Sequence, residues 1–260
     1  MFEKFMMPLD RQYDDGHEVT AEAFKDAAEK LSAEHEGKLT FMNGHLPINF
    51  LYRHAIELYL KSAIITVHRA LRLPTGNDPH TKDPLIKIDG KWKPIHRTHS
   101  LKWMLAELSR ILTDHKAILA THTPRNWETP QELVEWIDTI EAADGGSTYF
   151  RYPKSKGPNV DGEKSGFLPA DPEMLIAELN APREGQKGKM VLGLEDDDGN
   201  MVEVFAMQDD PLPELRNALV KAVGMMSGCA FGLYAELVCG YGKKGFEELA
   251  RGEGDDSGGN

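Results

Sequence analysis

Ile48–Arg72 reads INFLYRHAIELYLKSAIITVHRALR, a long stretch whose apolar residues recur at helical spacing. These apolar residues cover more than one helical face, so the stretch predicts a helix at the centre of a bundle. Pro47 suits the first turn of such a helix. The middle of the stretch nevertheless carries charge, because Arg53, Glu57 and Lys61 are four residues apart and share one stripe of the helix.

The position of this charged stripe decides the functional interpretation. If the stripe faces water, it carries little information. If it is buried, other segments must neutralise it, since an unpaired buried charge is costly. A structural network would pair Glu57 with Arg53, Lys61 or Arg151 and hold the bundle together. In a functional network the same groups would frame a site.

The rest of the chain supplies the other members of the bundle. Apolar periodicity predicts helices over residues 21–35, 99–119, 129–144 and 212–239, and a short helix over 171–179. Thr20 is placed as the N-cap of the first of these helices and Thr129 as that of the third, where Glu132 completes a capping box. We therefore expect about five substantial helices.

Two segments alternate in the manner of β-hairpins. Residues 84–95 alternate around Asp89-Gly90, and residues 189–207 alternate around an acidic turn that contains a glycine. The predicted fold is mainly α, a helical bundle of about five helices with two β-hairpin insertions. We expect a single domain over residues 1–251 and a disordered, Gly- and Asp-rich tail over 252–260.

The composition limits the function and the location of the protein. The net charge of −12 excludes a uniformly basic surface for nucleic acid but leaves room for a local basic patch. The acidic start of the chain is not typical of a signal peptide, and only 14 uncharged residues separate Lys221 from Glu236, too few to span a bilayer. Cys229 and Cys239 are predicted core thiols of a reducing compartment. These features favour a cytoplasmic protein without a membrane contact.

Gly224, Gly228 and Gly232 lie four residues apart in the last predicted helix. A stripe of glycines lets another helix approach closely, which gives their low helix propensity a packing reason. Two partners remain open: the 48–72 helix of the same chain, and a second subunit.

Three short segments, in their order and separation, resemble the HEPN-like helical domains of prokaryotes. They are RHAIELYLK at 53–61, HSLKWML at 99–105 and ADGGSTYFRYP at 143–153. The resemblance covers residues 45–155 and implies an all-α bundle that commonly dimerises. It further implies a homodimer in RNA metabolism or defence, with RNA as a ligand and a nucleotidyltransferase or an antitoxin as a protein partner.

Members of this superfamily include metal-independent RNases, which use an Arg, four to six residues and then a His, and also non-catalytic binding proteins. Only Arg110–His115 and Arg11–His17 have this spacing here. Arg110 is followed by Ile111, where a polar residue is usual, and Arg11–His17 precedes the bundle. The motif is absent or degenerate, which favours an RNA-binding or degenerate RNase-like protein and leaves enzyme activity open.

An RNase of this kind needs a histidine as general acid or base and a cation that holds the phosphate. The candidate catalytic residues are therefore His99, Arg151 and Arg53. The candidate binding residues are His54, Glu57, Lys61, Asp144, Tyr149, Tyr152 and Lys154. Within this set, the two carboxylates would orient the bases or pair with the cations.

These assignments have structural alternatives. His54, with apolar residues at neighbouring helical positions, fits a core histidine. In YFRYPKSK (149–156), either the aromatic rings stack on bases while the basic residues meet phosphates, or Phe150 and Tyr152 anchor the loop while the lysines stay solvated. The whole chain also fits a non-catalytic interaction protein whose buried charge network only holds a dimeric bundle.

No metal site and no cofactor is predicted. Five histidines fall between residues 80 and 122, and we interpret them as a surface group because no cysteine is nearby and no His-Glu-x-x-His string is present. The acidic turn Asp196–Asp198 lacks the ligand spacing of a calcium loop. The chain also has no phosphate-binding loop and no dinucleotide fingerprint.

Overall fold

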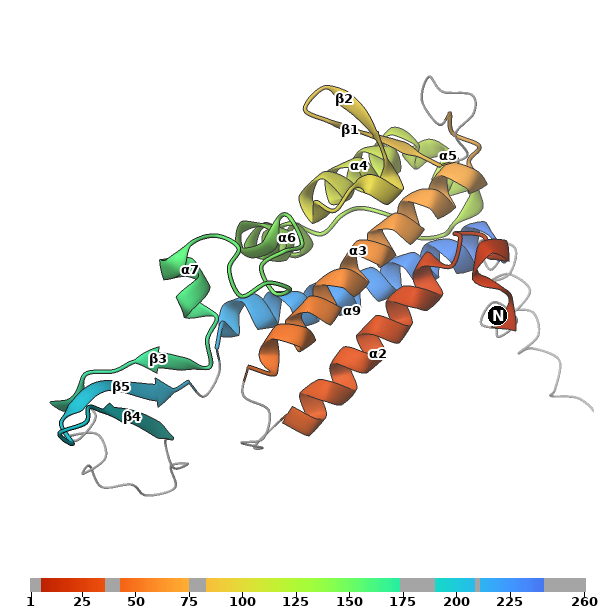
Figure 1. Ribbon diagram of the computed structural model, residues 1–260. Coiled ribbons are helices and arrows are strands. Elements are labelled where there is room, and N and C mark those ends of the chain that lie inside the picture. The colour runs from red at the N-terminus through yellow and green to blue at the C-terminus, as the bar shows by residue number, and fades with distance from the viewer. Residues whose placement is uncertain (1–5, 36–42, 75–82, 174–189, 209–210, 241–260) are drawn as a thin grey trace, which may run out of the picture.

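The computed structural model describes residues 6–35, 43–74, 83–173, 190–208 and 211–240 (Figure 1). Over these residues the chain is mainly helical, with one two-stranded and one three-stranded antiparallel sheet. This confirms the predicted class, a helical bundle with β-hairpin insertions. The predicted short helix over 171–179 lies mostly outside the described residues, and the predicted tail over 252–260 lies wholly outside them.

Helix α3 (His45–Ala70) is the centre of the bundle. Both α2 (His17–His35) and α9 (Pro213–Leu237) run along α3, whereas α4 (Leu101–Asp114) packs against α3 and α6 (Gln131–Asp144) packs against α9 (Figure 1). Because neighbours cover it on several faces, α3 is buried almost all the way round, as its apolar pattern predicted.

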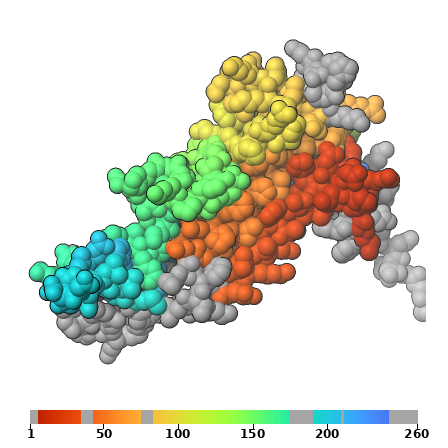
Figure 2. All heavy atoms as spheres, viewed as in Figure 1, coloured from red at the N-terminus to blue at the C-terminus, as the bar shows by residue number. Residues whose placement is uncertain are grey.

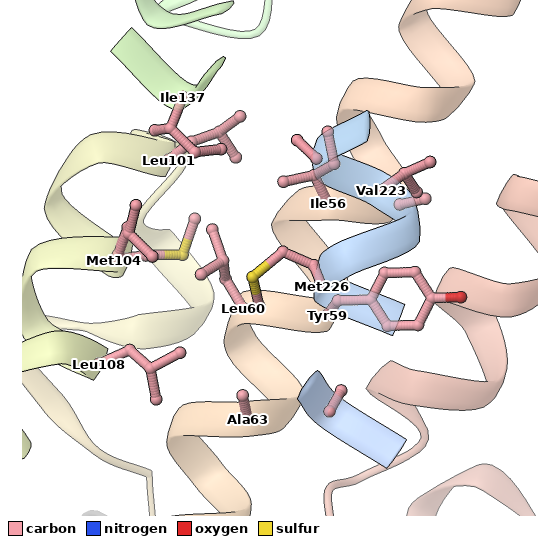
Figure 3. Close-up of a cluster of buried hydrophobic side chains, with 14 of the residues drawn as sticks. Ile56, Tyr59, Leu60, Ala63, Leu101, Met104, Leu108, Ile137, Val223 and Met226 are labelled. Atoms are coloured by element: carbon pink, nitrogen blue, oxygen red, sulfur yellow. The ribbon is translucent and has the colours of Figure 1, made fainter. Parts of the chain in front are cut away.

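The core lies where α3, α4 and α9 meet. Ile56 and Leu60 of α3 gather there with Leu101 and Met104 of α4 and with Met226 of α9 (Figure 3). All five side chains are fully buried. Burial of an apolar side chain of this size stabilises the fold by about 1.5–3 kcal/mol, so these contacts hold the charged stripe of α3 in a fixed orientation.

Two predicted helix caps are wrong. α2 begins at His17, because the Asp14 carboxylate accepts the backbone N–H of Glu18 at 2.8 Å and caps the first turn, which leaves Thr20 inside the helix. The hydroxyl of Thr129 hydrogen-bonds with that of Ser109 at 2.6 Å. Helix α6 therefore begins without a side-chain cap or a capping box.

The predicted helix over 99–119 consists of two helices. α4 ends at Asp114, His115 takes a φ of −108° and a ψ of 16°, and α5 (Lys116–His122) follows. Ser100 is the N-cap of α4, and its hydroxyl accepts the backbone N–H of Trp103 at 3.3 Å. His99 therefore precedes the helix instead of opening it.

The first hairpin is confirmed. Strands β1 (Leu85–Ile88) and β2 (Lys91–Pro94) are antiparallel, and both turn residues, Asp89 and Gly90, have positive φ. This is the backbone that a two-residue hairpin turn requires. The short 3-10 helix η2 (Ile95–Arg97) then leads into α4, and another, η1 (Leu9–Arg11), precedes α2.

The second hairpin is also confirmed, as β4 (Val191–Glu195) and β5 (Met201–Met207). A third strand, β3 (Phe167–Pro169), pairs with β5 and was not predicted, because three residues are too few to show an alternation. The short helix α7 (Pro158–Glu163) precedes β3. Figure 2 shows this sheet at one end of the helical body.

Among the described helices, α9 alone is long and apolar enough to cross a membrane, so the expectation that its uncharged run is too short for this is wrong as far as length and composition go. Half of its apolar stretch is buried inside the protein, where it packs on α3 and α6, which is consistent with a soluble protein. Both cysteines are free: Cys229 is half-buried, whereas Cys239 is exposed beyond the end of α9. The prediction of two core thiols is therefore wrong for Cys239.

The three glycines of α9 have different surroundings. A Cβ atom at Gly232 would lie 2.7 Å from Cη2 of Trp127, so this glycine admits a close contact with a loop side chain. Gly224 and Gly228 are exposed, and a Cβ atom there would meet nothing within 4 Å. Neither glycine is therefore needed for a close contact with another described helix, so the intrachain explanation of the stripe does not hold for these two.

Candidate functional site

The charged stripe of α3 is buried. The exposed fractions of Arg53, Glu57 and Lys61 are 0%, 1% and 4%. The stripe extends toward the start of α3 through buried Asn49 and His45, again at four-residue spacing. It therefore faces the interior and needs partners from other segments.

The Arg53 guanidinium joins three segments of the chain. Nη1 donates to Oε2 of Glu57 at 2.7 Å, Nε donates to the backbone carbonyl of Asp144 at 3.3 Å, and Nη2 donates to the backbone carbonyl of His99. One buried cation thus fixes the end of α6 and the approach to α4 onto α3. A guanidinium used in this way cannot also hold a phosphate.

Glu57 accepts from the other side of the network. Its Oε1 accepts from Nζ of Lys61 at 2.8 Å and lies 3.0 Å from Nδ1 of His99. Burial raises the pKa of Glu57, but Lys61, Arg53 and His99 lower it by more, so its pKa lies below the ordinary value. Glu57 is therefore a carboxylate at neutral pH and pairs with both adjacent cations.

Asp144, the last residue of α6, is 1% exposed and organises a turn. Its Oδ1 accepts the backbone N–H groups of Thr148 at 2.6 Å and Tyr149 at 2.9 Å. Oδ2 makes no hydrogen bond with a described residue and lies 3.6 Å from Nε of Arg53. The carboxylate thus sets the direction in which the chain leaves α6.

His99 is the exposed member of the group. Its side chain is 57% exposed, and Glu57 holds its Nδ1. The other ring nitrogen, Nε2, has no hydrogen-bond partner among the residues described. When Nδ1 carries the proton, Nε2 is an acceptor open to solvent, which is the arrangement of a general base.

His54 lies on a neighbouring face of α3 and is half-buried. Its ring meets that of Phe24 edge-on at 4.6 Å and stacks on that of Phe50 at 5.7 Å. Burial lowers the pKa of His54, and the nearby cations lower it further against the opposing effect of Glu57. A neutral imidazole between two phenyl rings agrees with the core-histidine alternative.

The segment 149–156 divides into anchors and exposed residues. Tyr149 and Phe150 are buried, and the Tyr149 hydroxyl donates to the carbonyl of Val160 at 3.1 Å. Tyr152 is 52% exposed, so the loop is anchored by Tyr149 and Phe150 and not by the predicted pair of Phe150 and Tyr152.

Arg151, Tyr152 and Lys154 are exposed, and we call them the loop patch. The guanidinium carbon of Arg151 lies 5.4 Å from the ring centroid of Tyr152 and 6.0 Å from that of Phe50. Arg151 forms no ion pair with a described carboxylate, so it does not join the buried network of α3.

Two further residues fix the loop and were not predicted. Lys164 is 4% exposed, and its Nζ donates to the carbonyls of Tyr149 at 3.0 Å and Tyr152 at 2.8 Å and to Oδ1 of Asp161 at 2.9 Å. Asp161 also accepts the backbone N–H groups of Ser155 at 2.8 Å and Gly157 at 2.9 Å. Lys164 and these two N–H groups hold the pKa of Asp161 well below its ordinary value. The Asp161–Lys164 pair has the local i,i+3 spacing, but no local pattern signals the contacts of Lys164 with Tyr149 and Tyr152, since these depend on the path of the loop.

The described histidines between residues 80 and 122 have different surroundings. His96 approaches Asp83 at 3.4 Å, His99 belongs to the network above, and His122 is exposed. His80 lies outside the described residues. Within the described part of the chain, no group of three or more His, Cys, Asp or Glu residues is placed to hold a metal ion.

No protein-family model, no curated protein and no solved structure matches this chain.

Proposed function

We propose that this protein is a cytoplasmic, HEPN-like RNA-binding protein that holds single-stranded RNA on the loop patch. The pairing of exposed Arg151 with exposed Tyr152, 5.4 Å apart, carries the proposal. An aromatic face stacks on an unpaired base while an adjacent cation meets a phosphate. Lys154 adds a second exposed cation two residues further on.

The backbone under the loop patch supports this proposal. Asp144 fixes the start of the loop through two N–H groups, and Lys164 fixes its middle through the carbonyls of Tyr149 and Tyr152. A loop that is already ordered loses less conformational entropy when it binds a ligand. The patch therefore presents its ring and its cations in a ready arrangement.

The buried network favours binding over cleavage. Arg53 and Lys61 are buried and paired with the carboxylates of Glu57 and Asp144. His99 is the exposed member of that network, and its Nε2 is open. Cleavage by this class needs a phosphate-holding cation beside the histidine. We expect a homodimer that acts in RNA metabolism or defence by binding.

The test is a titration of fluorescent single-stranded oligoribonucleotides of varied sequence at low salt. Arg151→Ala and Tyr152→Ala should each weaken binding by about 5- to 100-fold, the range for loss of one stacking or phosphate contact. Lys102→Ala is the matched control, because Lys102 is exposed and pairs with Asp138 at 2.7 Å. The absence of binding by folded wild-type protein to every RNA would end the proposal.

A second candidate is a non-catalytic interaction protein whose charges only hold the fold. The complete pairing of Arg53, Glu57 and Lys61 among themselves and with neighbouring segments favours it. In that case the loop-patch variants have the same RNA affinity as the wild type, and the wild type binds RNA no better than a control protein of equal net charge.

A further inference from the structure

A cavity of about 210 Å³ lies between α5 and the loop that follows it. Lys116, Leu119 and Ala120 line it from α5, and Thr123, Arg125 and Trp127 line it from the loop. Pro124 and Asn126 complete the lining, so two of the eight groups are cations and the others are an indole ring, a hydroxyl, an amide and aliphatic carbon. This lining suits a ligand with an apolar body and a negative charge.

The side chains around Arg125 are held in place by a buried carboxylate. Glu236 of α9 is 5% exposed; its Oε2 accepts from the hydroxyl of Thr123 and from Nε1 of Trp127, the latter at 3.1 Å. Nε of Arg125 lies 2.8 Å from Oε1 of Glu236. The ring of Trp127 is further fixed against Gly232, where there is no side chain to displace it.

This arrangement leaves the outer part of Arg125 unused. Its side chain is 58% exposed, and its two terminal nitrogens donate to no described residue. Paired N–H groups of a guanidinium match the two oxygens of a carboxylate. A cationic ligand is disfavoured, because the carboxylate of Glu236 is already paired with Arg125. The guanidinium carbon of Arg125 also lies 5.9 Å from the ring centroid of Trp127.

Lys116 supplies a second positive charge at the cavity. Its Nζ contacts Glu128 at 2.6 Å, and these side chains are 58% and 62% exposed. An exposed pair of this kind adds little stability, so Lys116 can exchange Glu128 for a ligand at small cost. An apolar cavity of about 150 Å³ holds benzene, so the present volume accommodates one ring with a small substituent.

We propose that this cavity binds a small aromatic carboxylate, with its ring against Trp127 and its carboxylate on the terminal nitrogens of Arg125. The site is separate from the loop patch: the cavity lies before the start of α6 and the patch follows its end, and 14 residues of helix span about 20 Å. The proposal therefore does not depend on RNA binding.

Calorimetric titration of the full chain with benzoate tests the proposal, with benzyl alcohol as the neutral ligand of matched shape. We expect saturable binding with a Kd below about 1 mM, and binding of benzyl alcohol at least about tenfold weaker, since it lacks the charge-assisted pair. No saturable heat with millimolar benzoate overturns the proposal, as does equal binding of the two ligands. If 5′-AMP binds and benzoate does not, the proposed ligand class is wrong.

Variants locate the binding. Arg125→Lys keeps a cation beside Glu236 but lacks the paired N–H groups, and should weaken benzoate binding by about tenfold. Lys116→Ala changes only an exposed residue and should weaken it about two- to fivefold with the fold intact. Lys102→Ala, the exposed control on α4, should leave binding unchanged. Unchanged affinity in both Arg125→Lys and Lys116→Ala places the ligand elsewhere and overturns the assignment.

Discussion

Arg53 and Arg151 are the same residue type in two different regions, the interior of α3 and the loop after α6. Arg53 is fully buried, and its N–H groups donate to the carboxylate of Glu57 and to the backbone carbonyls of Asp144 and His99. Arg151 is exposed, has no carboxylate partner in the described chain and lies beside an aromatic ring. Burial thus separates the charges that hold the fold from the charges available to a ligand.

The largest expected effect is the loss of stability when Arg53, the buried arginine, is replaced. Arg53→Met leaves Glu57 and Asp144 buried without their shared cation, so the free energy of unfolding should fall by about 3–5 kcal/mol. Urea denaturation measures it. Arg151→Ala, the matched exposed arginine, should change stability by no more than about 0.5 kcal/mol. Similar losses in the two variants would contradict the comparison.

The loss of stability at acidic pH tests the role of Glu57 in the same network. Because the pKa of Glu57 is lowered by folding, its contribution is present above the ordinary pKa of 4.5 and is lost as the pH falls through the folded value. Thermal unfolding should therefore show a loss of wild-type stability below about pH 4.5 that is smaller in Glu57→Gln. The variant itself should be less stable at pH 7, by about 2–4 kcal/mol, because buried Lys61 loses its carboxylate and Arg53 keeps only that of Asp144. Parallel pH profiles would refute the role of Glu57.

On the loop side, Lys164→Met should release the loop that carries the patch. It removes the donor shared by the carbonyls of Tyr149 and Tyr152 and should cost about 1–3 kcal/mol. Trypsin should then cut at Arg151 or Lys154 faster than in the wild type, while the helices resist. Lys156→Met is the control, since its Nζ donates one exposed hydrogen bond to the carbonyl of Ala142 and otherwise lies 5.8 Å from the ring centroid of Tyr149. Equal cleavage rates in the two variants would show that Lys164 does not hold the loop.

Substitutions at the glycines of α9 should give the smallest effects, and they again compare a buried position with an exposed one. Gly232→Ala should destabilise by about 1–3 kcal/mol, because its Cβ would meet a Trp127 ring whose one N–H is shared between Thr123 and Glu236 and holds it in place. Gly228→Ala meets nothing and should stabilise by up to about 1 kcal/mol through helix propensity. If Gly228→Ala instead destabilises and shifts sedimentation from dimer to monomer, that face packs between subunits.

The sequence predicts much of the fold because periodicity is a local property. The α3 pattern and the Asp89-Gly90 turn each determine their element within a few residues. The errors arise where a residue outside the local pattern makes the hydrogen bond. Asp14 caps α2 in place of Thr20, and the hydroxyl of Thr129 hydrogen-bonds with Ser109. The strand β3 exists only because β5 pairs with it.

For the candidate site, helical spacing put Arg53, Glu57 and Lys61 on one stripe. The expected pairing of Asp144 with a cation of the stripe is present at Arg53, and His99 reaches the stripe at Glu57. Spacing alone could not place Arg151, because its direction depends on how the chain turns after α6. The contacts of Lys164 depend on the same turn.

The central claim is that the exposed loop patch binds RNA while the buried charges only hold the fold. The most direct test is the RNA affinity of the double variant Arg151→Ala/Tyr152→Ala beside the wild type at matched thermal stability. We predict at least about a tenfold loss of affinity, an unchanged unfolding temperature and a weaker salt dependence. An RNA affinity equal to that of the wild type, in a variant that unfolds at the same temperature, would contradict the claim.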